Sequence, residues 1–220
     1  MRIRRFSSVF VLSLAAIGTA VTLAGQDVKA DLRDPSTIVG DAPAKYQALF
    51  ETSKGSFTIE VDKSWAPRGA IRFYNLVKNG YYNDARVFRV LPGFMAQFGI
   101  KGIPDIDVAW RGARIVDDVR QQTNERGYVS FAAGGANTRT TQVFVNLKDN
   151  KPLDDRNFAP FGRVVNGMNN IEKLYDGYGD GAPNGSGPDQ NKVYAEGNAY
   201  LLKSFPKLDY IKTATIVDGK

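Results

Sequence analysis

Residues 86–99 read RVFRVLPGFMAQFG, and in this stretch two short apolar runs flank the dipeptide Pro92-Gly93. Proline followed by glycine is typical of a turn, so the pattern predicts a strand on each side of it. Alternation along the strands places Arg89 and Gln97 together on one face. A cation, an amide, aromatic rings and a thioether so close together are consistent with the wall of a groove. Taken alone, Arg89 is more typical of a surface ion pair.

The chain of 220 residues contains no histidine and no cysteine. Ser-His-Asp and Cys-His nucleophile systems, structural zinc, Cys-ligated iron–sulfur clusters and His-ligated haem all need one of these residue types. The acidic residues are scattered along the sequence, which disfavours a hydrolase built on a carboxylate pair. If the protein is an enzyme, we therefore expect a reaction without a proton shuttle and without a covalent intermediate.

The first 24 residues have the layout of a secretory signal. Arg2, Arg4 and Arg5 precede an uncharged apolar run from Val9 to Ala24, and small residues near positions 24 and 30 supply two possible cleavage sites. The alternative is an uncleaved membrane anchor, for which the run is short. We therefore expect residues 1–30 to be a signal peptide and the mature protein to be exported, either periplasmic or secreted, with no stable membrane insertion after cleavage.

The signal also changes the meaning of the net charge. The whole chain has a formal charge of +6, of which three charges belong to the arginines before the apolar run. The mature protein is therefore near +3, and no block of Lys and Arg occurs elsewhere. This balance argues against a nucleic-acid partner.

The rest of the chain predicts one domain of mainly antiparallel strands over residues 45–218, preceded by an extended linker at 31–44. Most of the expected strands alternate apolar and polar residues, and the two expected helices begin and end at proline and glycine signals. The stretch 100–122 is expected to be irregular and exposed, and the glycine-rich stretch 177–208 a long loop. The expected strands are the two arms of a hairpin at 46–62 that turns at Ser53-Lys54-Gly55, followed by 86–91, 94–99, 127–133, 140–147, 158–165 and 210–217, and the expected helices are 67–80 and 167–175. Such a set favours a barrel or a sandwich.

Four blocks of the sequence, in order, resemble the cyclophilins, a family of peptidyl-prolyl cis-trans isomerases. They are RFYNLVKNGYYNDARVF at 72–88, FRVLPGFMAQFG at 88–99, GGANTRTTQVFVNL at 134–147 and LDDRNFAPFGRVVNGMNNIEKL at 153–174. Each block is a weak signal alone, but the set covers residues 45–176 and is specific. With the signal sequence, it favours an exported form, and we expect that form to be bacterial.

The resemblance implies a closed eight-stranded antiparallel barrel capped by two α-helices, and catalysis of X-Pro bond rotation without a cofactor. Arg89 matches the catalytic arginine of the family. Substrate-binding positions fall on Phe94, Met95, Gln97, Ala132, Ala133, Gly134, Gln142, Phe144, Leu153 and Asn157. The expected partners are proline-containing segments of unfolded or flexible exported proteins.

Some positions depart from the family pattern. Ala133 replaces an asparagine, Asn157 replaces a histidine in the groove, and a tryptophan beside Leu153 is replaced by Pro152. The loss of the tryptophan predicts weak cyclosporin binding. These departures also keep open a second function, a cyclophilin-fold module that binds or chaperones peptides with little turnover.

Isomerisation of an X-Pro bond suits a site without histidine. The barrier of ~18–20 kcal/mol arises because the nitrogen lone pair is shared with the carbonyl, and no bond breaks during rotation. A fixed N–H donor aimed at the nitrogen favours the twisted state over both planar states. One charged hydrogen bond contributes about 1.5–3 kcal/mol, whereas a rate gain of about 10⁵ needs ~7 kcal/mol. Positioning and desolvation must supply the balance.

Overall fold

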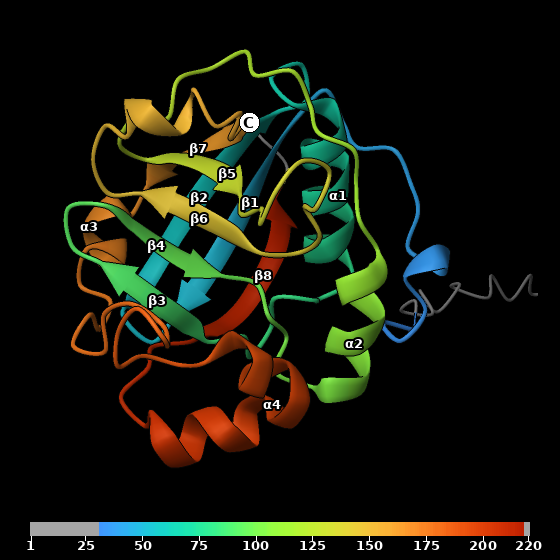
Figure 1. Cartoon of the computed structure of the whole chain (residues 1–220). Helices are drawn as coiled ribbons and strands as arrows, with labels where there is room; N and C mark the ends of the chain where they lie inside the picture. Colours follow the sequence, from blue (N-terminus) through green and yellow to red (C-terminus); the bar gives the residue numbers. More distant parts are fainter. Residues whose placement is uncertain (1–30, 218–220) are drawn as a thin grey trace, which may run out of the picture.

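The computed structural model describes residues 31–217, and the expected signal peptide at 1–30 lies outside the described residues. Eight strands form one antiparallel sheet in the order β3-β4-β6-β5-β7-β2-β1-β8, which curls around a single core (Figure 1). The strands are β1 (Lys45–Thr52), β2 (Gly55–Asp62), β3 (Val87–Leu91), β4 (Met95–Phe98), β5 (Tyr128–Phe131), β6 (Val143–Asn146), β7 (Pro160–Asn166) and β8 (Ile211–Val217). All eight expected strands are therefore present, some shorter than expected.

Helices and two short 3₁₀ turns surround the sheet. They are α1 (Pro67–Lys78), α2 (Pro104–Gly112), α3 (Met168–Ile171) and α4 (Gln190–Ser204), with 3₁₀ turns η1 (Pro35–Thr37) and η2 (Lys151–Leu153). None of the helices within 31–217 is long and apolar enough to cross a membrane. The described part of the chain thus carries four helices, where two were expected.

The two edge strands of the sheet meet at one end of the barrel. Arg86 and Tyr210 form an isolated antiparallel bridge. The backbone N–H of Val87 donates to Asp209 O at 2.9 Å, and that of Ile211 donates to Ala85 O at 2.9 Å. These bonds join the beginning of β3 to the beginning of β8, and so cover part of the backbone that an open edge would expose.

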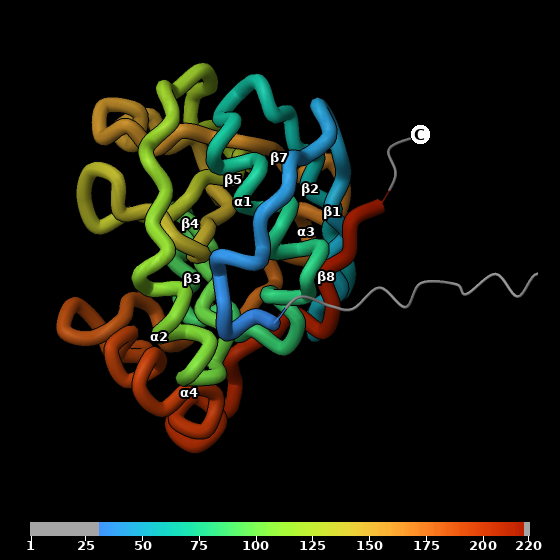
Figure 2. Tube along the Cα trace, turned by 90° about the vertical axis from the view of Figure 1, so that its right-hand side faces the viewer, coloured from blue at the N-terminus to red at the C-terminus, as the bar shows by residue number. Residues whose placement is uncertain are grey.

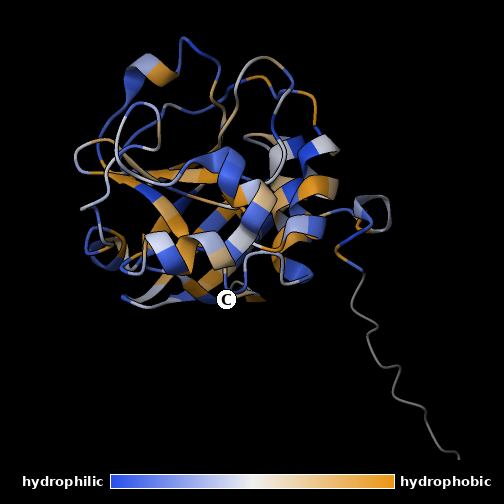
Figure 3. Cartoon of the chain, turned by 60° about the horizontal axis from the view of Figure 1, so that its bottom comes forward, coloured by the Kyte–Doolittle hydropathy of each residue, from blue (hydrophilic) through white to orange (hydrophobic). Residues whose placement is uncertain are grey.

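The first hairpin and α1 follow the sequence pattern. Phe50 of β1 lies opposite Phe57 of β2, and their rings stack 5.0 Å apart. Helix α1 begins at Pro67, where the missing N–H costs no hydrogen bond, and buries Phe73 against the sheet. Figure 3 shows hydrophobic colours concentrated along the strands and hydrophilic colours on many of the surrounding loops. The core is therefore the inside of the curled sheet together with the inner face of α1.

Residues 31–44 run along the outside of the helices as an extended segment interrupted by η1 (Figure 2). Side chains of the domain hold it in place. Trp110 Nε1 donates to Leu32 O at 2.8 Å, and Asn75 Nδ2 donates to Gly40 O at 2.8 Å. Ile38 is buried against the core. The expected linker is thus attached to the domain surface.

The expectation of an irregular, exposed stretch at 100–122 is wrong for its first half, which contains α2. Pro104 occupies the first turn, and Ile106 and Trp110 turn inward one helical turn apart. Asp107 is fully buried and accepts the backbone N–H groups of Lys101 and Gly102 at 2.7 and 2.8 Å. These contacts with neighbouring elements stabilise a helix of only nine residues.

The expectation of a long loop at 177–208 is wrong for its second half, which contains α4. Helix α4 lies outside the barrel, beside β3 and α2 (Figure 1). Its residues Val193, Tyr194 and Leu201 form a second apolar cluster with Phe88, Ile100 and Leu208. The expected helix at 167–175 is also shorter than predicted, because only 168–171 are α-helical.

Candidate active site

A cavity of about 250 Å³ opens on the outer face of the barrel. Eight of the expected site residues line it: Arg89, Phe94, Met95, Gln97, Ala132, Ala133, Phe144 and Leu153. Three residues that the sequence analysis did not single out complete the wall, namely Arg156, Phe158 and Gln190. Six separate segments, from β3 to the start of α4, therefore contribute to one cavity.

The floor of this cavity is apolar. Met95, Phe144 and Leu153 form a small buried cluster, 2–7% exposed, with Phe94 and Phe158 packed against it. The rings of Phe144 and Phe158 meet edge to face at 5.6 Å. This cluster is separate from the barrel core, so its exposed side is free to receive an apolar group such as a ring.

Strand register brings the polar side chains to the same cavity. Gln97 of β4 lies opposite Arg89 of β3 on one side and opposite Phe144 of β6 on the other. Residues directly opposite in a sheet point to the same face, so a cation, an amide and an aromatic ring are placed side by side. The Arg89 Nη1 donates to Gln97 Oε1 at 3.1 Å.

A carboxylate from the segment after α3 holds the same arginine. Arg89 Nε donates to Asp180 Oδ1 at 2.7 Å, and Nη2 donates to Oδ2 at 3.1 Å. These hydrogen bonds, with the positive charge of the guanidinium, hold the pKa of Asp180 below its ordinary value. The guanidinium is thus fixed on two edges. Asp180 accepts hydrogen bonds along the Nε–Nη2 edge, and Gln97 accepts one from Nη1. No sequence signal marked Asp180, which lies among glycines in a stretch expected to be a loop.

A chain of hydrogen bonds extends the site away from Arg89. Gln97 Nε2 donates to Gln142 Oε1 at 2.7 Å. Gln142 Nε2 in turn donates to Tyr194 Oη at 2.9 Å and to Gln190 Oε1 at 3.1 Å. Helix α4 therefore orients both glutamines that the sequence placed in the groove.

The other expected residues line two neighbouring cavities. Gly134 and Gln142 line one of about 420 Å³, which shares Gln97, Ala132, Ala133 and Gln190 with the first cavity. Asn157 lines another of about 290 Å³ and adopts a left-handed conformation with φ of 57°. Asp117 is the one acidic residue that lines any of these three cavities. The carboxylate pair that a hydrolase would need is therefore not found at this site.

The arrangement can grip and polarise an amide without any proton transfer. Arg89 is a planar, permanently charged donor whose side chain is 24% exposed. Its field is strengthened where protein replaces part of the water. An apolar ring on the Met95–Phe144 floor would therefore lie next to a fixed N–H donor.

Comparison with known proteins agrees with the fold. Residues 48–193 match the sequence profile described as "Cyclophilin type peptidyl-prolyl cis-trans isomerase/CLD". The chain is 36% identical over 128 residues to peptidyl-prolyl cis-trans isomerase-like 1 of Aspergillus oryzae, covering 57% of this chain and 79% of that protein. It is 31% identical over 181 residues to peptidyl-prolyl cis-trans isomerase-like 2 of Gibberella zeae, covering 79% of this chain and 30% of that protein.

Solved structures show the same fold. A cyclophilin-type isomerase of Cryptosporidium parvum superimposes with a TM-score of 0.58 at 18% identity, covering 80% of this chain and 99% of that one. A second structure of that protein, determined in the presence of the dipeptide Ala-Pro, gives a TM-score of 0.57 at 18% identity, with 79% and 99% covered. With the matching profile and relatives, these observations establish that the chain belongs to the cyclophilin-type family of peptidyl-prolyl cis-trans isomerases.

Proposed function

We propose that Arg89 is the catalytic residue of this isomerase and that the 250 Å³ cavity binds the proline ring. One observation carries the proposal: Arg89 lines the same cavity as Phe94, Met95 and Phe144. The structure of the Cryptosporidium protein determined with Ala-Pro supports a proline-containing segment as the substrate.

The geometry suggests how rotation would be accelerated. The ring would rest on the apolar floor while the preceding carbonyl turns, and the backbone of Ala132–Gly134 would pair with the residue before the bond. Arg89 would donate a hydrogen bond to the nitrogen only when the lone pair has returned to it, in the twisted state. The hydrogen bonds that Arg89 donates to Asp180 and Gln97 fix the guanidinium beforehand, so little reorganisation accompanies the reaction.

An Arg89→Ala variant tests the assignment. Exchange NMR on an Ala-Pro peptide measures cis–trans interconversion directly, against an uncatalysed exchange that takes tens of seconds or longer. We expect the variant to lower the catalysed rate at least ~10-fold, while peptide affinity changes less. Arg163→Ala, in an exposed ion pair with Glu60, is the matched control. Unchanged turnover in a folded Arg89→Ala protein would remove Arg89 from its role.

A second candidate function is a binding module with little turnover. Asp180 favours it, because its carboxylate already occupies the Nε–Nη2 edge of the guanidinium and offsets its charge. In the same NMR experiment, such a module would broaden the peptide signals without accelerating exchange. The wild-type protein alone therefore separates the two candidates.

We also propose that the protein acts on exported clients as a periplasmic or secreted, bacterial form. The signal-like sequence at 1–24 supports this proposal, whereas the relatives described above are fungal. Mass spectrometry of the protein purified from the exported fraction would give its N-terminus. We expect cleavage near residue 24 or 30, and an intact N-terminus in the cytoplasmic fraction would contradict export.

Weak cyclosporin binding is the last part of the proposal. Pro152 and Leu153 lie in η2 at the rim of the cavity, where Leu153 is buried and Pro152 is exposed. A proline has no indole N–H with which to bond a cyclic peptide. Calorimetric titration with cyclosporin is expected to give a much weaker affinity for wild type than for a Pro152→Trp variant.

A further inference from the structure

We propose that the 420 Å³ cavity beside the isomerisation site selects an acidic side chain in the segment that precedes the proline. The inference rests on the proposed function, because it assigns a substrate class to the same groove. Two arginines, Arg111 and Arg114, line this cavity, and no Asp or Glu does. Both come from α2 and the turn that follows it, in the stretch 100–122 that the sequence analysis left without a role.

The two cavities form one continuous path for a peptide. They share Gln97, Ala132, Ala133 and Gln190, and Gly134 lines only the larger of the two. A peptide that pairs with the backbone of Ala132–Gly134, with its proline on the apolar floor, would pass from one cavity into the other. The residues two and three positions before the proline would then lie in the larger cavity.

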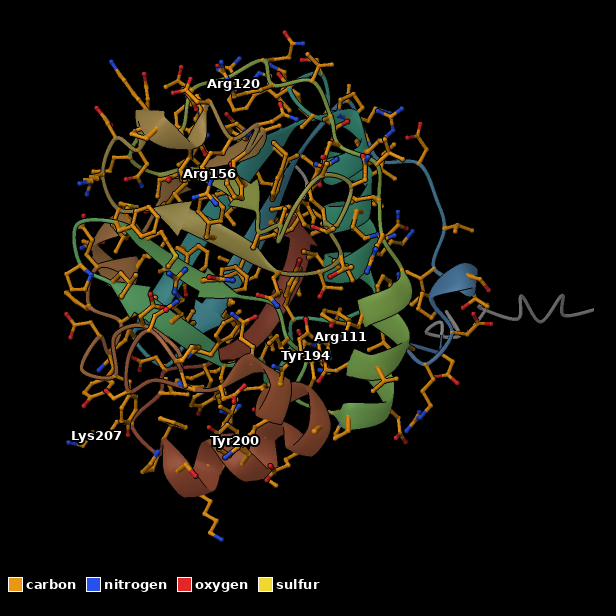
Figure 4. All side chains as sticks on the ribbon, viewed as in Figure 1. Arg111, Arg120, Arg156, Tyr194, Tyr200 and Lys207 are labelled. Carbon is orange, nitrogen blue, oxygen red and sulfur yellow. The ribbon has the colours of Figure 1, made fainter. Side chains whose placement is uncertain are left out.

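Arg111 is oriented toward this path before any peptide binds. Its guanidinium lies over the ring of Tyr194, 4.8 Å from the ring centroid, and its Nη2 donates to Asn191 Oδ1 at 3.1 Å. Tyr194 is itself fixed, because its Oη accepts the hydrogen bond from Gln142. Figure 4 shows Arg111 and Tyr194 together where α2 approaches α4. The charge is therefore positioned by the same helix that orients the groove glutamines.

Neither of the two arginines is neutralised within the described residues. No ion pair of residues 31–217 includes Arg111 or Arg114, and both are exposed. The acidic residues nearby are engaged elsewhere. Asp180 binds Arg89, Asp117 pairs with Arg139 at 3.2 Å, and Asp107 is buried under backbone N–H groups. A carboxylate of a peptide would thus meet two cations that have no ion-pair partner among residues 31–217.

The expected size of the effect follows from the exposure of these groups. Solvent-exposed ion pairs are individually weak and are screened by salt. Two cations acting on one carboxylate should favour Glu over Gln by about 3- to 10-fold in kcat/KM at low ionic strength, and should disfavour Lys. The preference should shrink in about 0.5 M NaCl, where screening extends over only a few ångströms.

The test is a set of peptides of one sequence that carry Glu, Gln or Lys at the second or third position before proline. Exchange NMR gives kcat/KM for each, and an NMR titration gives Kd independently of turnover. For the wild type we expect Glu above Gln above Lys in both quantities. For an Arg111→Glu/Arg114→Glu double variant we expect the order to reverse. Lys203→Glu, which makes half of that charge change on the exposed side of α4, should leave the order unchanged.

The outcomes separate the inference from the proposed function. Equal Kd values for the three peptides, or a preference that survives the double substitution, would overturn the acidic subsite. A preference for Glu placed after the proline instead would overturn the assigned direction. Failure of the wild type to accelerate exchange in the Gln peptide would overturn the proposed function alone, since the Kd comparison still tests the subsite. If the Arg111→Glu/Arg114→Glu variant does not fold, Arg111→Gln/Arg114→Gln replaces it in the experiment. This neutral variant should remove the preference for Glu without reversing it.

Discussion

Arg89 and Asp180, 91 positions apart in the sequence, are joined by a two-pronged ion pair with N–O distances of 2.7 and 3.1 Å. A planar guanidinium bound by two hydrogen bonds along one edge has little freedom to rotate. The segment that follows α3 therefore contacts β3 and fixes the residue that we propose to be catalytic.

Asp180→Asn should lower kcat/KM by about 3- to 10-fold, mainly through kcat, because an amide can accept only one of the two hydrogen bonds and carries no charge. Exchange NMR gives the rates, and the NMR resonance of the Arg89 Nε–H reports whether the guanidinium has become mobile. Glu196→Gln removes one negative charge from an exposed position of α4 and serves as the control. Faster turnover in Asp180→Asn would mean that the carboxylate restrains the arginine rather than orients it.

Arg89→Lys keeps the charge but should still lower the catalysed rate at least about 10-fold. A lysine ammonium has no planar fork, so it cannot bond both oxygens of Asp180 and also Gln97 in the same geometry. Arg163→Lys, made at an exposed pair, should retain the wild-type rate. If Arg89→Lys were as fast as wild type, charge alone would be sufficient and the fixed geometry would be unnecessary.

Asp107 predicts a pH dependence of stability. Burial raises its pKa from an ordinary 3.8 to about 6, and the backbone N–H groups of Lys101 and Gly102 offset only part of this effect. Between about pH 4 and 6 the folded protein keeps a proton that the unfolded chain has lost. The folded state then binds more protons, so this group makes the protein less stable as the pH rises, by on the order of 2–3 kcal/mol in total.

Urea unfolding of the wild type and of Asp107→Asn at several pH values checks this pH dependence. The contributions of other titrating groups cancel in the difference between the two free energies of unfolding. The stability of the wild type relative to Asp107→Asn should therefore fall from pH 4 to pH 7. Val108→Ala, an uncharged change on the exposed side of the same helix, should give a difference that is nearly constant with pH, because it removes no titrating group. A constant difference for Asp107→Asn as well would show that its pKa is not raised.

Gly197 is a position where only glycine fits. Its φ of 62° and ψ of −148° are accessible essentially to glycine alone, and a Cβ would overlap the carbonyl oxygen of Gly102 and the ring of Pro104. Gly197→Ala should destabilise the protein by at least about 2 kcal/mol in thermal or urea unfolding. Gly112→Ala, where a Cβ meets no atom within 4 Å, should be neutral or slightly stabilising. Equal stabilities of the two variants would contradict the close packing of α4 on α2.

Local pattern predicted most of the barrel. The hairpin of β1 and β2, helix α1 and the strands around the Pro92-Gly93 turn were all read from alternation, helical spacing and turn residues. Helix α2 was also readable, since Ile106 and Trp110 follow Pro104 at helical spacing. It was missed because it is short and flanked by glycines. The sequence pattern did not indicate α4, because Gly197 interrupts the helical periodicity of this stretch. The same glycine allows α4 to approach α2.

The sequence by itself determined the family and the residues of the apolar cavity, because strand register carries alternating residues to a known face of the sheet. Tertiary structure decided how Arg89 is held and what surrounds the groove. A register shift between Val87 and Arg89 turns Phe88 out of the barrel and under α4. Gln190 and Tyr194 reach the groove because α4 packs there, and Asp180 reaches Arg89 from the segment between α3 and α4. These contacts join residues that are far apart in the chain, and local periodicity contains no information about such pairs.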